Sequence, residues 1–478
     1  MIKTVAGSNP SASVLETVAV LPFINMSANQ GDEYFCDGLA EDLLNALSKV
    51  EALKVVPRRS AFSFKGKSTT LSDIGTKLGV TNVVEGSIRR SGDRVRISVR
   101  LINPADGYQM WAERYDREMR DIFALQDDIT LAVVEALKLT LFGDEKAAVL
   151  RRHTDDPEAY ELYLKGRFHS YKYTAEGWQL AIELFEQAIQ RQPNYAVAYA
   201  GIADARGCQY FFGILPAEKT VQDSRAASGT ALEIDPSLAD AHMTRALITF
   251  FYDCQWQLAE REFRQCLALD PNHAEALSYY AMFLVFLGRN DEGAKLSQKA
   301  LELDPLAPLI NMNCGWNYFA AGMLGEASAQ AAKMIANDPD FYGAYWLQGA
   351  IHLSSGEFDQ AVAQLKTAVM LGGHSIVIAD LASACCLAGK TDTAAEILES
   401  LREARERSYV PAICLARVCS RLGQMEQAIE WLETASEERN GEMVFLSSEI
   451  AGAADGDPLS RLANEPRVNA LLEKMKLP

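Results

Sequence analysis

The spacing of hydrophobic residues changes near residue 142 and divides the chain into two parts. In residues 94–102 every second residue is apolar and the residues between them are polar, which predicts a half-buried strand paired with residues 83–88 through a turn at 91–93. Short apolar runs predict two more strands, at 18–23 and 53–56. Apolar residues at helical spacing predict three helices, at 34–50, 71–78 and 121–141. Strands that alternate with helices predict an α/β domain.

Beyond residue 156 the apolar residues recur at helical spacing instead, in segments that end on an Asp-Pro pair. The prolines of these pairs are Pro236, Pro271, Pro305 and Pro339, which stand 35, 34 and 34 residues apart. Proline lacks an N–H and disfavours helix at the residue before it, so each pair predicts a turn between helices. Small residues such as Gly349 and Ala361 fall where two helices would approach most closely.

A period of 34 residues with two helices per unit resembles the tetratricopeptide (TPR) repeat, in which each helix pair buries its apolar face only against a stacked neighbour. Counting outward gives about eight helix-turn-helix repeats in residues 157–440, followed by a capping segment in 441–478. The predicted fold class is therefore an α/β amino-terminal domain plus an all-α right-handed TPR solenoid. Residues 1–16 are predicted to be a disordered tail and residues 143–156 a linker.

The first part also contains four short motifs, AVLPF at 19–23, EYFCDGL at 33–39, VEGSIR at 84–89 and WAERYD at 111–116. Together they resemble the bacterial TolB-like amino-terminal module, here at residues 17–142. In many proteobacterial regulators this module directly precedes a TPR array, and the pair follows a class III nucleotide cyclase or a winged-helix DNA-binding domain. Because only about 16 residues precede the first strand, we expect no effector domain in this chain.

The net charge of −18 is unevenly distributed over the 478 residues. Residues 1–150 contain 18 Lys and Arg against 20 Asp and Glu, so most of the excess negative charge lies in the repeats. An acidic array repels phosphate backbones, which argues against nucleic-acid binding by the repeats.

Several residue patterns bear on location and cofactors. No apolar run reaches the roughly 18 residues of a membrane helix, and the amino terminus lacks the pattern of a signal peptide, so we expect a cytoplasmic protein without membrane contact. The nine Cys are scattered without a Cys-x-x-Cys motif, and the six His are dispersed. We therefore expect reduced thiols, no metal site and no cofactor.

One motif suggests catalysis. Gly66-Lys67-Ser68 lies between a predicted strand and a predicted helix, where a phosphate-binding loop would lie. The first glycine of such a loop is replaced by Ala61, and Phe62 and Phe64 crowd the backbone. Since no other nucleophile, base and oxyanion arrangement is present, we expect the protein not to be an enzyme.

The first helix of each TPR unit lines the concave face of the solenoid, so its side chains predict the binding groove. The groove residues that we predict are Met243, Phe250, Met282, Met312, Trp316, Phe319 and Trp346. Methionine and aromatic side chains suit an amphipathic helix or an extended apolar segment of a protein partner. The alternative is that the solenoid or the amino-terminal module covers this stripe itself.

A second candidate surface is a basic face on the first domain, formed by Arg58, Arg59, Arg94, Arg96 and Arg100. It would dock an acidic partner or a small anion, whereas the simpler reading is the solvated outer face of an alternating sheet.

Together these features give the hypothesis of a non-enzymatic adaptor in bacterial signalling or regulation that holds a protein partner in the concave TPR groove. The alternative is a detached regulatory half of a nucleotide cyclase or a winged-helix regulator, acting on an effector supplied in trans. The sequence leaves open the identity of the partner and whether the chain forms a homodimer.

Overall fold

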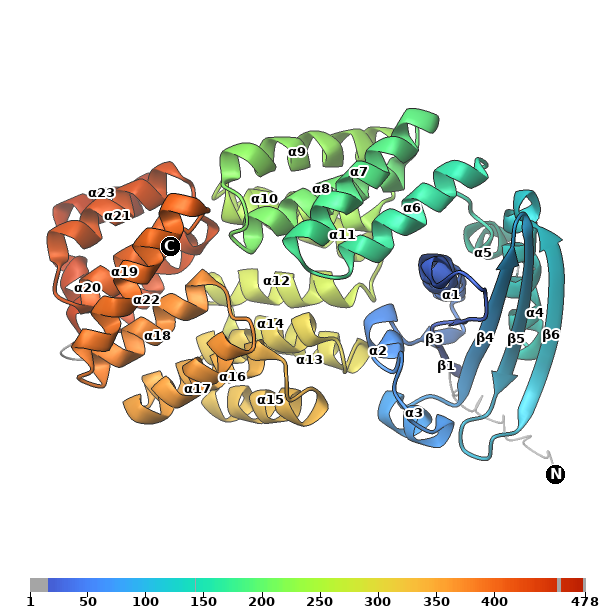
Figure 1. The fold of residues 1–478 in the computed structure, drawn as a ribbon, viewed down its shortest axis with the longest axis horizontal. Coiled ribbons are helices and arrows are strands. Elements are labelled where there is room, and N and C mark those ends of the chain that lie inside the picture. Colours follow the sequence, from blue (N-terminus) through green and yellow to red (C-terminus); the bar gives the residue numbers. More distant parts are fainter. Residues whose placement is uncertain (1–15, 142, 454–456, 476–478) are drawn as a thin grey trace, which may run out of the picture. The chain divides into compact units, whose positions relative to one another are not determined.

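A computed structural model describes residues 16–141, 143–453 and 457–475 of the chain (Figure 1). The chain forms two compact units, Met1–Pro157 and Glu158–Pro478. Apart from Glu16, the tail predicted at residues 1–16 lies outside the described residues. The order of the two units is the predicted one, with a mixed-sheet domain followed by a helical TPR array.

The first unit is built on a six-stranded mixed sheet. Its strands are β1 (Glu16–Val20), β2 (Ile24–Asn25), β3 (Leu53–Val55), β4 (Asn82–Ser91), β5 (Arg94–Ile102) and β6 (Gln109–Glu118). The order is β3-β1-β4-β5-β6, and β2 pairs with β4. Strand β1 is parallel to β3 and β4, whereas β4, β5 and β6 are antiparallel neighbours. The predicted hairpin is confirmed, with Ser91 opposite Arg94.

The helices of this unit are α1 (Glu33–Leu47), α2 (Arg58–Phe62), α3 (Leu71–Leu78), α4 (Ile122–Ala136) and α5 (Gly143–Val149), with 3-10 turns η1 (Gln30–Asp32) and η2 (Met119–Asp121). Helices α1 and α4 pack against each other, and both contact the sheet. The apolar residues of β5, such as Val95 and Ile97, are fully buried, as the alternation predicts. The predicted linker at residues 143–156 contains α5.

The second unit consists of eight consecutive helix pairs. They are α6 (Pro157–Ser170) with α7 (Ala175–Arg191), α8 (Ala196–Phe211) with α9 (Ala217–Ile234), α10 (Ala239–Phe251) with α11 (Trp256–Leu269), α12 (Ala274–Phe286) with α13 (Asn290–Leu303), α14 (Pro308–Ala320) with α15 (Leu324–Asn337), α16 (Tyr342–Ser354) with α17 (Phe358–Met370), α18 (Ser375–Leu387) with α19 (Thr391–Arg407) and α20 (Ala412–Arg421) with α21 (Met425–Glu437). From α8 to α16 and again from α18 to α20, first helices of adjacent pairs contact each other.

Small residues form the seam inside a helix pair. A Cβ atom added to Gly349 on α16 would lie 2.5 Å from Cγ of Leu365 on α17. Leu365 and Ala361, both on α17, are fully buried. Gly356 in the intervening turn has φ 74°, a left-handed conformation that glycine adopts without strain. The sequence prediction of small residues at the closest helix approach is thus confirmed.

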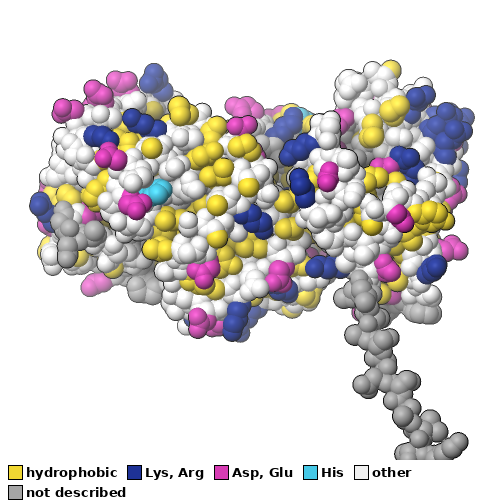
Figure 2. All heavy atoms as spheres, turned by 90° about the horizontal axis from the view of Figure 1, so that it is seen from below, with side chains coloured by type: hydrophobic (Ala, Val, Ile, Leu, Met, Phe, Trp, Pro, Cys, Tyr) yellow, Lys and Arg dark blue, Asp and Glu magenta, His cyan; other side chains and the backbone are white. Residues whose placement is uncertain are grey.

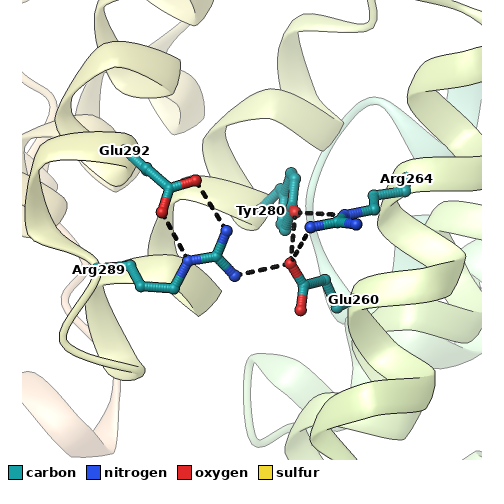
Figure 3. A network of polar contacts seen from close by, with 5 residues as sticks. All are labelled: Glu260, Arg264, Tyr280, Arg289 and Glu292. Atoms are coloured by element: carbon teal, nitrogen blue, oxygen red, sulfur yellow. Dashed lines mark hydrogen bonds and ion pairs between the residues drawn. The ribbon is translucent and has the colours of Figure 1, made fainter.

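Polar side chains add contacts between the third and fourth pairs (Figure 3). The carboxylate of Glu260 on α11 accepts hydrogen bonds at Oε1 from Arg264 (2.7 Å), Tyr280 (3.0 Å) and Arg289 (2.7 Å). Arg289 also pairs with Glu292 at 2.8 Å. Burial alone would raise the pKa of Glu260, but the hydrogen bonds from Arg289 and Tyr280 hold it below its usual range.

The chain ends with four short elements, the 3-10 turn η3 (Gly441–Phe445), α22 (Leu446–Ala451), the 3-10 turn η4 (Pro458–Asn464) and α23 (Pro466–Lys474). Helix α23 packs on α21, and η4 packs on α20 and α22. On the face drawn in Figure 2, hydrophobic side chains gather in patches between acidic and basic ones. That face therefore carries both signs of charge.

Candidate protein-binding surface

The predicted groove residues all lie on first helices of the repeats and form what we call the inner stripe. They are Met243 and Phe250 on α10, Met282 on α12, Met312, Trp316 and Phe319 on α14, and Trp346 on α16. Residues three, four or seven positions apart share one face of a helix, which gives each helix one row on the stripe. Contacts between adjacent first helices then join the rows.

The amino-terminal end of the stripe is covered by the end of the chain itself. Phe250 is fully buried and Met243 is 4% exposed. The ring of Phe445 in η3 lies 6.5 Å from that of Phe250 and 6.4 Å from that of Phe286 on α12. Val444 is buried in the same hydrophobic cluster. This end of the stripe therefore belongs to the core of the closed array, which is the alternative that the sequence left open.

An apolar insertion at residues 210–219, where α8 ends and α9 begins, also folds onto the array. The ring of Phe212 stacks on Trp178 at 5.4 Å, and the ring of Phe211 lies 5.1 Å from that of Phe251. A Cβ atom on Gly213 would lie 3.1 Å from Cγ of Pro411, at the start of the eighth pair. The insertion thus serves packing in this structure.

The middle of the stripe keeps a half-buried aromatic cluster. Trp316 on α14 and Trp346 on α16 have ring centroids 4.8 Å apart, and Phe319 lies 5.6 Å from Trp316. His374 continues the cluster at 5.7 Å from Trp346, and burial lowers its pKa to about 4, so this imidazole is neutral at pH 7. Within the described residues, neither Nε1 of Trp316 nor Nδ1 of His374 has a hydrogen-bond partner.

At the carboxyl-terminal end the stripe becomes charged, which the sequence analysis missed. Asp380 on α18 accepts a hydrogen bond of 2.7 Å from the indole N–H of Trp346, 34 residues earlier. Arg417 and Arg421 follow on α20. Burial raises the pKa of Asp380 above its usual range, although both arginines oppose this shift. Asp380 stands one repeat period of 34 residues after Trp346, so the same period that places Trp346 on the stripe also places Asp380 there. The sequence therefore contained the signal for Asp380.

Both arginines are paired with carboxylates from the end of the chain. Arg417 contacts Glu442 at 3.1 Å and also binds Glu449, and its side chain is 7% exposed. Arg421 lies 3.2 Å from a carboxylate oxygen of Asp457. The carboxylate-binding groups at the charged end of the stripe are therefore occupied, whereas the aromatic middle contains Nε1 of Trp316 and Nδ1 of His374 without partners among the described residues.

The arginines of the predicted basic face are paired as well. Arg94 and Arg96 bind one oxygen each of Asp116, at 2.6 and 2.7 Å, and these hydrogen bonds lower the pKa of Asp116 to about 2. Arg100 pairs with Glu85 on β4. Arg58 pairs with Glu41 at 2.9 Å and lies over the ring of Phe62.

Of the five predicted arginines, Arg58 and Arg59 lie side by side on α2, whereas the other three lie on β5. The two groups thus come from different elements, and each group has carboxylate partners within the first unit.

Metal sites, membrane helices, a phosphate-binding loop and reactive thiols are further kinds of candidate chemistry. Among those residues, no group of three or more His, Cys, Asp or Glu is arranged to hold a metal ion. No described helix combines the length and the apolar character that crossing a bilayer requires. Gly66 adopts φ 73°, and the neighbouring Lys65 binds Asp37 at 2.6 Å. Burial raises the pKa of the Cys36 and Cys414 thiols to about 12, so both remain protonated at pH 7.

Comparison with known proteins identifies the repeats. Tetratricopeptide repeat models match residues 249–308, 315–374 and 415–440. The chain is 36% identical over 241 residues to "Putative adenylate cyclase 3" of Rhizobium meliloti, a match covering 50% of this chain and 41% of that protein. It is 23% identical over 163 residues to "Transcriptional regulator HilA" of Salmonella typhimurium, covering 34% and 29%. The chain thus spans less than half the length of these relatives.

Two solved structures are similar to part of the chain. The type IV pilus biogenesis factor PilW is 21% identical with a TM-score of 0.36, covering 48% of this chain and 98% of that one. Yeast Tom70 is 15% identical with a TM-score of 0.42, covering 75% and 82%.

Proposed function

We propose that this protein is a non-enzymatic adaptor in bacterial signalling or regulation and that it holds a protein partner on the aromatic middle of the inner stripe. The observation that carries the proposal is the contact between Trp316 and Trp346 on adjacent repeats, both half-buried. The indole N–H of Trp316 is buried without a hydrogen-bond partner among the described residues, and a ligand carbonyl or carboxylate would accept from it once the neighbouring side chains move aside. Leaving such a donor unpaired costs about 1–3 kcal/mol, and aromatic residues commonly dominate binding energy at interfaces.

The first unit is, in this proposal, a TolB-like module with a sensing or docking role. Its basic residues remain the proposed docking face, with one restriction from the geometry. An acidic partner would have to displace Asp116 from Arg94 and Arg96, and Glu41 from Arg58. Binding there is therefore expected to be weaker than binding to unpaired arginines.

A reducing cytoplasmic location fits the cysteines. None of the nine forms a disulfide in the structure, and the thiols of Cys266 and Cys314 are fully buried. Disulfides are typical of oxidising compartments, so a chain whose nine Cys form no disulfide is suited to the cytoplasm.

The second candidate function is a regulatory half of a nucleotide cyclase or a winged-helix regulator that acts on an effector supplied in trans. It is favoured by the partial similarity to one protein named as a cyclase and another named as a transcriptional regulator. The two candidates share the same binding surface and differ in the identity of the partner.

Affinity capture with the full chain tests both. Trp316→Ala and Trp346→Ala should each reduce recovery of a specific partner at least about tenfold, as loss of an interface hot spot does. Trp431→Ala is the matched control, because Trp431 lies on the second helix α21 and packs under Arg405.

Equal recovery with the stripe variants and with the Trp431 control would refute the stripe as the binding site. A captured protein with a cyclase or DNA-binding domain would select the second candidate function. Circular dichroism of each variant checks that the array is folded, because truncating a buried Trp can cost about 3–5 kcal/mol.

A further inference from the structure

Residues 439–450, which we call the closing segment, join two distant parts of the array. Met443 is fully buried in the hydrophobic cluster of the last three helix pairs. The next residue, Val444, is fully buried in the cluster of α8 to α12. In Figure 1 the red carboxyl-terminal elements and the green helices α8–α10 belong to these two clusters. One 3-10 turn thus connects repeats that are far apart in the sequence.

The array supplies a cation for this segment. The side chain of Arg417 is 7% exposed, and both of its carboxylate partners, Glu442 and Glu449, come from the closing segment. Neighbouring carboxylates raise the pKa of Arg417 despite its burial, so it stays charged. Removing the partners of a buried charge is strongly destabilising, so this arginine requires an anionic occupant.

The array also supplies an aromatic pocket. The ring of Phe445 lies 6.1 to 6.5 Å from the rings of Phe250, Phe251 and Phe286. The hydroxyl of Tyr210 donates a hydrogen bond of 2.9 Å to the carbonyl oxygen of Arg439. Aromatic pairs in this distance range stabilise a contact beyond the burial of their area.

A segment that only capped the hydrophobic core would need no buried charge. Replacing a buried ion pair with apolar residues is often neutral or stabilising, so the burial of Arg417 is weak evidence for a purely stabilising role. The pairing of Arg417 with Glu442 fixes the register that places Phe445, three residues later, in the aromatic pocket. This arrangement is that of a receptor and a short peptide ligand.

We propose that the closing segment is an internal ligand of the array and that its site accepts a partner peptide of the same chemistry, a carboxylate followed three residues later by an aromatic side chain. The inference rests on the proposed function, because such a peptide would extend onto the inner stripe beside Trp346. A tethered ligand competes at an effective concentration of roughly millimolar, so the partner must displace it. The closed array is thereby the resting state.

The test uses the full chain and a fluorescent peptide with the sequence of residues 439–450, RNGEMVFLSSEI. In one variant, Glu442→Gln and Phe445→Ala weaken the internal ligand. Fluorescence anisotropy should show at least about tenfold tighter peptide binding to this variant than to the wild type, because intramolecular competition is reduced. A peptide with the same two substitutions is the matched control and should not bind. Adding Arg417→Gln to the variant should remove the gain.

Hydrogen exchange of the wild type tests the same proposal without a variant. Amides of residues 439–450 should exchange through a local opening, at least about tenfold faster than the amides of α10 and α11, as low-stability elements do. The proposal is overturned if the segment exchanges only with global unfolding, or if the peptide binds both proteins equally. The peptide assay contains no cellular partner, so a negative result there would refute the internal ligand without refuting partner capture through Trp316. A negative capture experiment would likewise refute the proposed function without changing the peptide result.

Discussion

Gly349→Ala offers the sharpest test of how the repeats pack. The new Cβ atom would lie 2.5 Å from Cγ, 2.8 Å from Cδ2 and 3.3 Å from Cδ1 of Leu365. Leu365 is fully buried between α16 and its neighbours, so it cannot turn outward to relieve the overlap. The two helices must therefore separate or Leu365 must leave its preferred rotamer.

The size of the effect follows from two opposing contributions. Overpacking a well-packed core costs about 1–3 kcal/mol, whereas replacing glycine by alanine inside a helix stabilises it by about 1 kcal/mol. The net expectation for Gly349→Ala is a loss of about 1 kcal/mol. Gly229→Ala is the matched control, because Gly229 lies inside α9 with nothing within 4 Å of an added Cβ atom. That variant should gain about 0.5–1 kcal/mol.

Urea unfolding followed by far-UV circular dichroism measures both variants against the wild type. Repeat arrays do not always unfold in one step, so the comparison uses the transition midpoints and the sign of their shifts. Gly349→Ala should lower the midpoint and Gly229→Ala should raise it. If Gly349→Ala raised the midpoint as much as the control, helix propensity alone would govern these positions, and the contact with Leu365 would have no energetic weight.

Three further predictions concern charged groups. Burial raises the pKa of Asp380, so the stability that its protonated form contributes is complete below the ordinary pKa of Asp and is lost as the pH rises through the raised pKa. The variant Asp380→Asn keeps an acceptor for the indole N–H of Trp346 but carries no charge. In urea unfolding it should therefore stabilise the array at pH 8 but not at pH 4. Burial opposes the charge on His273, but Asp240 raises its pKa to about 9. The stability that the charged His273 contributes is therefore complete below about pH 6.5 and is lost as the pH rises through about 9. Asp240→Asn should flatten the dependence of the melting temperature on pH in that range. Glu260→Ala should cost about 1 kcal/mol or less in 0.1 M salt and less in 1 M salt, because Glu260 and Arg289 in the network of Figure 3 are only partly buried and Arg264 is exposed.

Local periodicity was sufficient to predict most of the fold. The helix pairs and the strand β5 follow from apolar spacing, since each buries one face. Strand β6 (Gln109–Glu118) was missed because its side chains are exposed at most positions, so no alternation marks it. It is recognised only through its antiparallel pairing with β5. Helix α5 lies in the charged stretch predicted as a linker, where most side chains are exposed and no apolar face was visible.

The inner stripe was predictable only as far as the repeat length stays constant. Trp346 and Asp380 are separated by the 34-residue period, but Arg417 follows 37 residues later, and the intervening α19 has 17 residues instead of the 13 of α17. The contact of Phe445 with Phe250 joins the third pair to the end of the chain and leaves no local signal in the sequence. Such closure is a property of the stacked array as a whole, and it explains why part of the predicted groove is core.

Release of the closing segment would change the charge of the site in a definite direction. In the closed array, Arg417 faces Glu442 and Glu449, with Asp380 nearby. Departure of the segment removes two carboxylates and leaves a cation at the end of the stripe, within an array whose net charge is strongly negative. Beyond the Debye length of about 8–10 Å, salt screens the repulsion between the acidic array and an acidic peptide, whereas a buried contact with Arg417 is screened much less. Added salt should therefore speed the association of such a peptide while leaving most of its contact energy in place, and this combination distinguishes a recessed cation from an exposed basic patch.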